Sequence, residues 1–159
     1  LYKYAQERFA PMIAKKIVAS REKTPITLST QLADIIESAI QAKFRGGKIH
    51  PATKAFQAFR IAVNHELDCI EPGIRAVLSV LKKGGRLGVI TFHSLEDKIV
   101  KNLFKEMSLE CVCPPRIPQC VCGKIKEVEI IGKSFTADEE ELRDNPPSRS
   151  ARLRIVEKL

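Results

Sequence analysis

A short apolar run between a glycine turn and a polar corner constrains this fold more than any other feature of the sequence. Residues 87–92 are nearly all apolar and follow Gly84-Gly85, a pattern typical of a parallel strand that is covered on both faces. A helical stretch, residues 56–67, precedes the turn, and His93-Ser94 follows the strand. This order predicts one α/β unit of a doubly wound sheet. Because such sheets bind ligands at the carboxyl ends of their strands, His93 and Ser94 are candidate site residues.

The first 44 residues are predicted to form a small helical unit. Apolar residues at helical spacing predict one helix over residues 4–20, and Pro25 is expected to end it. A second helix is expected to begin near Ser29 or Thr30, because either hydroxyl could cap its first turn.

Two helices are expected between residue 51 and the glycine turn. The first should bury a stripe of apolar side chains at helical spacing, namely Phe56, Phe59, Val63, Leu67 and Ile70. Cys69 lies beside this stripe and is expected in the core. Residues 71–73 are expected to interrupt the helix, and a second helix should then end at Gly84, a residue suited to a left-handed cap.

The second half of the chain is predicted to form two helices and two further strands. Ser94 with Asp97 three residues later, and Thr136 with Glu139, each match the pattern of a helix-capping box. Strands are predicted near residues 125–131 and 151–157. Asn145-Pro146-Pro147 is interpreted as a helix terminator rather than as an amine-binding motif, since Ser148 stands where that motif has an aromatic residue.

The composition favours a polyanionic partner. The chain has 159 residues, enough for one domain with a core, and 27 Lys and Arg against 19 Asp and Glu give a net charge of +8. Nucleic acid is the usual partner of such a surface, although a basic surface kept for solubility has the same composition. No apolar run is long enough to span a membrane. Five cysteines without a signal peptide predict a reducing compartment, the cytoplasm, and the start at Leu1 indicates a fragment.

Four stretches together resemble one family. They are residues 47–53, 56–67, 92–101 and 149–154, in the family's order and at roughly its spacing. The sequence is similar to the bacterial methyltransferases that modify the N4 of a cytosine in 16S ribosomal RNA, and it resembles their C-terminal portion. The resemblance implies part of a class I, Rossmann-like methyltransferase sheet and part of an inserted all-helical domain. Residues 1–44 would end the insert, and 45–159 would belong to the methyltransferase domain.

The same resemblance implies a place for each strand and for the cofactor. Residues 87–92 would be the fifth, central parallel strand, and the last two strands would form an antiparallel pair at the sheet edge. S-adenosylmethionine would be held by residues upstream of this chain, so no cofactor-binding residue is assigned here. The glycines at 46–47 and 84–85 are not substitutes, because a nucleotide-binding glycine turn follows a strand and opens a helix.

The resemblance implies that the intact enzyme methylates an exocyclic amine in the decoding region of the small ribosomal subunit. His93 is a candidate to contact the target base or to help remove a proton, and the alternative is that it satisfies a backbone group while Ser94 caps the helix. Asn64 is the second catalytic candidate. It lies one helical turn from Arg60, and the two either face the substrate or lock the helix to its neighbour.

Basic residues in two regions are candidate contacts to RNA phosphates, which arginine forks fit well. They are Arg45, Lys48, His50, Arg60, Arg149, Arg152 and Arg154. A solvated charged surface is the alternative for each of them. A module that binds RNA without catalysis is therefore the alternative function.

Four cysteines form two pairs, with six residues between the pairs. Cys111, Cys113, Cys120 and Cys122 could close a tetrahedral zinc site, although ligand pairs usually have two or more residues between them. A reduced surface loop is the alternative. If zinc binds, the chain could instead be a protein-interaction domain held together by the metal.

Overall fold

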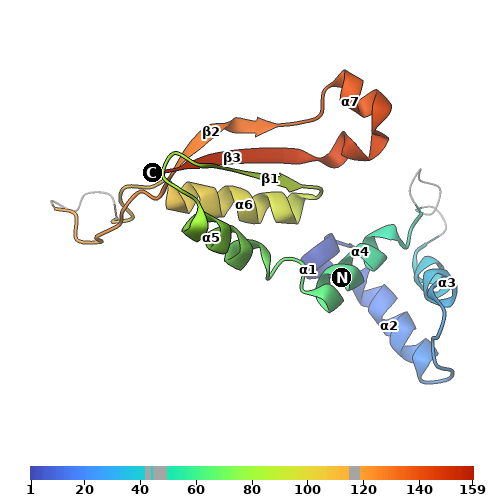
Figure 1. Ribbon diagram of the computed structural model, residues 1–159. Helices are drawn as coiled ribbons and strands as arrows, with labels where there is room; N and C mark the ends of the chain where they lie inside the picture. Colours follow the sequence, from blue (N-terminus) through green and yellow to red (C-terminus); the bar gives the residue numbers. More distant parts are fainter. Residues whose placement is uncertain (42–43, 45–49, 115–118) are drawn as a thin grey trace. The chain divides into compact units, whose positions relative to one another are not determined.

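The computed structural model describes residues 1–41, 44, 50–114 and 119–159, which form two compact units, Leu1–Glu66 and Leu67–Leu159 (Figure 1). The predicted domain boundary at residues 44 and 45 stays a prediction. The compact units divide later because the helix at Thr53–Asn64 packs with the N-terminal helices. Within the described ranges, no helix combines the length and the apolar character that crossing a bilayer requires.

The N-terminal unit is helical. It contains α1 (Tyr2–Ala5), α2 (Ala10–Arg21), α3 (Ser29–Ala39) and α4 (Thr53–Asn64). Their core consists of buried aliphatic and small side chains, namely Ile13, Ile36, Ala39, Ile40, Ala52 and Ala55.

The helix predicted over residues 4–20 is divided in two. Gln6 ends α1 in the left-handed conformation, with φ of 48°, and the chain re-enters the helix at Ala10. Pro11 lies in the first turn of α2, where no backbone donor is needed. The predicted start of α3 at Ser29 is confirmed, although the cap position itself is Leu28.

The buried face of α4 differs from the predicted stripe. Small residues and one isoleucine are buried there, and Val63 is 76% exposed. Phe56 and Phe59 pack at the edge of the core instead of filling it. The small side chains of Ala55 and Ala58 thus face the core, and the two phenylalanines lie at its rim.

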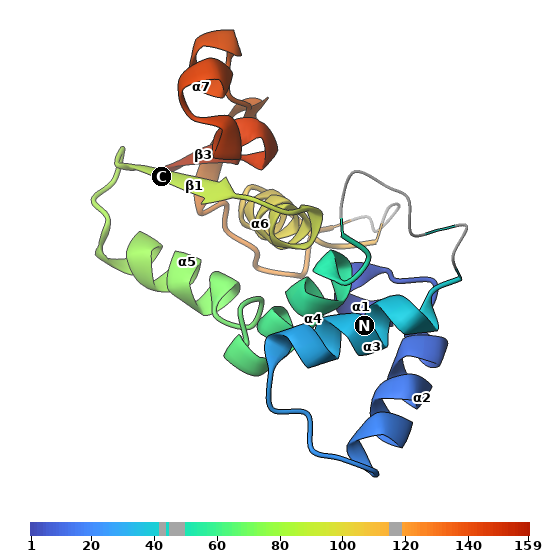
Figure 2. The same ribbon diagram turned by 90° about the vertical axis from the view of Figure 1, so that its right-hand side faces the viewer.

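The C-terminal unit is a three-stranded sheet covered on one face by helices (Figures 1 and 2). Its elements are α5 (Ile70–Val80), β1 (Arg86–Thr91), α6 (Ser94–Met107), β2 (Val128–Phe135), α7 (Glu139–Asp144), the 3-10 helix η2 (Pro146–Ser150) and β3 (Arg152–Lys158). The strand order is β1-β3-β2, and both pairings are antiparallel. The strands predicted near 125–131 and 151–157 are therefore neighbours, as expected.

One core joins the two helices to the sheet. Side chains from α5, α6, β2 and β3 form it, namely Ile74, Leu78, Val100, Leu103, Phe104, Met107, Val128 and Val156. Leu87 and Val89 of β1 pack against it from the sheet. The described chain thus contains a mixed helix-and-strand unit, as the α/β prediction requires, but its sheet holds no parallel pair.

The surroundings of β1 differ from the prediction of a parallel strand covered on both faces. In the described residues, β1 is paired along one edge only, antiparallel to β3. Ile90, on the face away from the core, is 59% exposed. A local apolar pattern indicates a strand but does not specify its partner or the cover of its second face.

The ends of α5 and the turn that follows it also correct the prediction. Pro72 and Gly73 lie in the first turn of α5 rather than between two helices, and Cys69, just before it, is exposed rather than in the core. Gly84 has the expected left-handed conformation, with φ of 76°, but lies three residues beyond the cap of α5. Its N–H donates to the Lys158 carbonyl at 2.7 Å and so ties the turn to β3.

Candidate functional site

The corner between β1 and α6 is held by a reciprocal cap. His93 has extended backbone and occupies the cap position, so Ser94 is the first helical residue rather than the cap. His93 Nδ1 accepts a hydrogen bond from the Glu96 N–H at 3.4 Å. In return, Glu96 Oε2 accepts hydrogen bonds from the N–H groups of Phe92 and His93 at 2.8 and 3.2 Å. The capping box is therefore His93 with Glu96, one residue earlier than predicted. The Thr136 box is likewise displaced, since Asp138 caps α7.

The second nitrogen of His93 is not used by the cap. Nε2 lies 3.2 Å from Glu96 Oε1 but without hydrogen-bond geometry, and it is one of the two buried side-chain polar atoms in the described residues that have no hydrogen-bond partner. The side chain as a whole is largely buried. His93 thus caps α6 through Nδ1, while its Nε2 lies beside the Glu96 carboxylate and forms no hydrogen bond within the described residues.

Asp97, on the first turn of α6, holds an arginine of β3. Arg154 Nε and Nη2 donate to the two carboxylate oxygens of Asp97 at 2.7 and 3.0 Å. Only 12% of the Arg154 side chain and 18% of the Asp97 side chain are exposed. The hydrogen bonds from Arg154 lower the pKa of Asp97 below its ordinary value, and partial burial opposes this effect. Asp97 therefore anchors Arg154 and is not the capping-box partner of Ser94 that the sequence pattern predicts.

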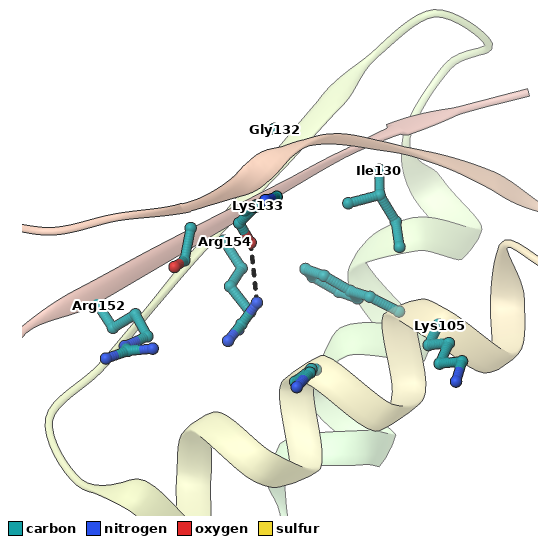
Figure 3. A pocket seen from close by; sticks show the side chains of 9 residues that line it. Lys105, Ile130, Gly132, Lys133, Arg152 and Arg154 are labelled. Carbon is teal, nitrogen blue, oxygen red and sulfur yellow. Dashed lines mark hydrogen bonds between the residues drawn. The ribbon is translucent and has the colours of Figure 1, made fainter.

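A basic pocket of about 440 Å³ lies beside this pair, between α6 and the strands β2 and β3 (Figure 3). Five cationic side chains line it, namely Lys101, Lys105, Lys133, Arg152 and Arg154. Phe104 and Ile130 contribute apolar surface. Figure 3 shows Lys105 on α6, Lys133 on β2, and Arg152 and Arg154 on β3.

The two arginines of the pocket differ in what binds them. Arg154 donates both to Asp97 and, through Nη1, to the Lys133 carbonyl at 2.9 Å. Arg152 is 47% exposed, and its closest carboxylate contact among the described residues is at 3.9 Å. Within those same ranges, no carboxylate forms an ion pair with Lys101, Lys105 or Lys133. Arg152 and the three lysines thus retain positive charge for a ligand.

The structure places the other predicted RNA contacts as follows. Arg149 lies exposed in η2, whereas Arg45 and Lys48 are outside the described residues. His50 accepts from the Ala52 N–H at 3.2 Å, and its Nε2 lies 3.7 Å from Glu37. The sequence analysis missed Lys101, Lys105 and Lys133. The four-residue spacing of Lys101 and Lys105 on one helix was a signal for these two, but it does not extend to Lys133 on β2.

Arg60 and Asn64 share a carboxylate within the N-terminal unit. Arg60 donates two hydrogen bonds to Glu66, at 2.7 and 3.0 Å, and Asn64 Nδ2 donates to the same carboxylate at 3.3 Å. The chain reverses at His65, which has φ of 53°, and this turn brings Glu66 back to α4. Both residues are exposed, and these contacts are local to the end of α4, so they do not show the buried pair that would lock the helix to its neighbour. A substrate role for either residue stays a prediction.

The four clustered cysteines come together in space. Neighbouring Sγ atoms are 3.5 to 3.8 Å apart, and all four lie within 4.8 Å of one another. The backbone N–H groups of Val112 and Lys124 bond to Cys122 Sγ and lower the pKa of this thiol to about 6. The four predicted metal ligands are thus brought together in space.

Comparison with known proteins adds the family. A family model described as the MraW methylase family matches residues 1–159. The chain is 52% identical over 157 residues to a protein of Trichlorobacter lovleyi named ribosomal RNA small subunit methyltransferase H, covering 98% of this chain and 50% of that protein. A protein of the same name from Treponema denticola is 50% identical over 160 residues, covering 100% of this chain and 51% of that protein.

These matches fix how much of a family member the chain represents. It spans about half the length of the curated relatives it matches. The matched residues run from the N-terminal helices through the basic pocket to the last strand. The chain belongs to the MraW methylase family.

Proposed function

We propose that this chain is the C-terminal part of an enzyme that transfers a methyl group from S-adenosylmethionine to the N4 amine of a cytosine in small-subunit ribosomal RNA. The family match and the names of the relatives support methylation of this RNA. The cytosine and its N4 atom rest on the sequence resemblance. Bacterial ribosomes lie in the cytoplasm, where we place the enzyme.

The position of the basic pocket is the observation that carries this proposal. Arg152 is the register partner of Thr91, the last residue of β1, and His93 follows two residues later. The pocket therefore begins at the strand end where doubly wound sheets bind their ligands. Phosphate groups beside a target base would contact Arg152 and the lysines there, and the corner between β1 and α6 would contact the base.

The sheet supports a place for the chain within a larger Rossmann-like fold. The order β1-β3-β2 fits a fifth strand followed by an antiparallel edge pair. We infer that β1 pairs, along the edge not bonded to β3, with a parallel strand from the rest of the enzyme. The exposed Ile90 and Phe92 would then gain apolar neighbours.

The glycine turn at residues 84–85 does not fit a cofactor-binding turn. S-adenosylmethionine supplies the methyl group when bound. At the glycine turn, however, a Cβ on Gly85 would lie 2.7 Å from Leu81 Cγ and 2.8 Å from the Lys82 carbonyl, so the chain itself fills this space. The Gly84 N–H is bonded to Lys158. We therefore assign the cofactor to the other half of the enzyme and derive no step through it here.

We propose that His93 contacts the target base in the intact enzyme, and Asn64 stays a second catalytic candidate from the sequence. The buried Nε2 of His93, which forms no hydrogen bond within the described residues, supports a role beyond capping. His93→Asn is the informative variant, because asparagine is a strong helix cap but has no imidazole. In the intact enzyme we expect it to slow methyl transfer by about 10²-fold or more, with unchanged thermal stability. Wild-type activity would show that His93 only caps α6.

Binding to RNA tests the pocket directly. The probe is a fluorescent oligonucleotide covering the decoding region of small-subunit ribosomal RNA, and the readout is its Kd as a function of salt. Replacing Lys101 and Lys105 together with glutamine should reduce the salt slope by about 1 per lysine. Lys82→Gln with Lys83→Gln is the matched control, since these lysines are exposed but outside the pocket. Equal effects of the two pairs would refute the pocket as the RNA site.

Catalysis is tested separately from binding. Calorimetric titration of this chain with S-adenosylmethionine should show no heat of binding, and the intact enzyme should bind it and methylate the RNA. Micromolar binding by the chain alone would contradict our assignment of the cofactor. RNA binding combined with an intact enzyme that transfers no methyl group would favour the alternative, a module that binds RNA without catalysis.

A further inference from the structure

We propose that Cys111, Cys113, Cys120 and Cys122 bind one structural zinc ion. The separations of the four sulfur atoms are close to those that a single ion requires. A tetrahedral zinc with Zn–S bonds of about 2.3 Å places its sulfur ligands about 3.8 Å apart. Four of the Sγ–Sγ distances here are 3.5, 3.5, 3.8 and 3.8 Å. A modest expansion of the cluster would accommodate the ion.

The backbone around the thiols is arranged to support sulfur ligands. The Cys113 N–H donates to Cys111 Sγ at 3.3 Å, and the Val112 N–H donates to Cys122 Sγ at 3.5 Å. Gly123, directly after the last cysteine, is left-handed with φ of 59°, which a residue with a side chain rarely adopts. Hydrogen bonds of this kind orient ligands and offset the charge that four thiolates bring to a metal.

The segment that carries the cysteines has little else to hold it. Between the end of α6 and the start of β2, the described residues contain no helix or strand and no buried side chain. Val112, Val121 and Ile125 are 55%, 80% and 77% exposed, so they supply no apolar core. The segment is closed at its base, where the Glu127 N–H donates to the Met107 carbonyl at 2.9 Å. Long connections without secondary structure are uncommon in compact domains unless a ligand or metal orders them.

Four clustered cysteines could instead form two disulfide bonds, and the experiment must distinguish this alternative from a zinc site. The chain is purified under anaerobic, reducing conditions, and its zinc content is measured by mass spectrometry of the metal. We expect one zinc ion per chain. After zinc is exchanged for Co²⁺, we expect the visible absorption of tetrahedral cobalt together with a thiolate-to-cobalt charge-transfer band.

Single substitutions assign the ligands. Cys111→Ser and Cys120→Ser should each weaken zinc binding by at least about 10-fold. Loss of a residue that only orients a metal ligand costs about 10–100-fold, so loss of a ligand itself should cost at least this much. Cys69→Ser is the matched control, because this cysteine is outside the cluster and should leave one zinc ion per chain. Hydrogen exchange of residues 109–127 should rise on chelation, while α6 should keep its protection.

Three results would overturn the proposal. One is a chain without zinc that also fails to take up added Zn²⁺ or Co²⁺. Another is a pair of disulfides in the protein as isolated from cells, detected by mass after alkylation of free thiols. The third is an equal zinc Kd, measured by competition with a chelator, in the wild-type chain and in the Cys111 and Cys120 variants. None of these readouts depends on RNA binding or methyl transfer.

Discussion

The ion pair between Asp97 and Arg154 gives the sharpest test of how α6 is held on the sheet. The change is Asp97→Asn, which keeps the size of the side chain and removes its charge. Two hydrogen bonds, at 2.7 and 3.0 Å, join the carboxylate to the guanidinium, and less than a fifth of either side chain is exposed. Breaking a buried pair costs about 3–5 kcal/mol, whereas an exposed pair contributes about 0–1 kcal/mol. Asparagine keeps one oxygen that can still accept from Arg154, so we expect a loss of about 2 kcal/mol.

A second ion pair on the same sheet is a matched control. Arg86 on β1 and Glu157 on β3 are opposite in register, with Nε 2.9 Å from Oε2, but their side chains are 66% and 31% exposed. Glu157→Gln should therefore cost about 0.5 kcal/mol or less. The assay is hydrogen exchange of β1 and β3 peptides as a function of urea. It reports on the C-terminal unit even if the two units unfold separately.

The pH dependence provides an independent check. Hydrogen bonds from Arg154 lower the pKa of Asp97 in the folded state. The stabilisation is therefore fully present above the unfolded pKa of about 3.9 and is lost as pH falls through the lower folded value. The difference in unfolding free energy between the wild type and Asp97→Asn should accordingly shrink below about pH 4. Equal losses for Asp97→Asn and Glu157→Gln, or a difference that persists at acid pH, would refute this reasoning.

Two further predictions concern the glycine turn and the pocket. Gly85→Ala should destabilise the C-terminal unit by about 2 kcal/mol in the same exchange assay, because its Cβ would overlap Leu81 and the Lys82 carbonyl. Gly73 lies in the first turn of α5 with open space around it, so Gly73→Ala should be neutral or stabilising by about 0.5–1 kcal/mol. A larger loss of stability for Gly73→Ala than for Gly85→Ala would contradict the geometry of the turn. Arg152→Gln should weaken RNA binding with little change in stability, whereas Arg154→Gln should cost about 3 kcal/mol because it leaves Asp97 unpaired. Similar stability losses for these two variants would contradict our assignment of Arg152 to RNA binding and of Arg154 to stabilising the fold.

Local patterns predicted which segments are helices and strands, but not the exact cap of each helix or the face that it buries. The start of α3 at Ser29 and the two C-terminal strands follow from sequence patterns. At α6, both Ser94-x-x-Asp97 and His93-x-x-Glu96 fit a capping box, and only the turn of the chain after Phe92 selects the second. At α4, alanines rather than phenylalanines face the core, because close approach of helices favours small residues over the most apolar ones.

The candidate sites were predictable to different degrees for a physical reason. The four cysteines were found from spacing because a ligand set within one loop is local in sequence. The basic pocket was found only in part, since it requires α6, β2 and β3 to meet in space. Arg152 and Arg154 were predicted as equivalent phosphate contacts. The sequence holds no signal that Asp97, 57 residues before Arg154, accepts two hydrogen bonds from that arginine but approaches Arg152 only to 3.9 Å.

Alternate residues of β3 explain why the basic pocket lies at one end of the sheet. Arg152, Arg154, Val156 and Lys158 all point to the face covered by α5 and α6, but their surroundings change along the strand. Arg152 is 47% exposed at the open end, Arg154 is bound to Asp97, and Val156 is fully buried in the core. Lys158 Nζ then donates to the Leu78 and Leu81 carbonyls at 2.7 Å and caps α5. The cationic groups of Arg154 and Lys158 on this face are thus bound within the fold, whereas that of Arg152, at the end near His93, is left available to a ligand.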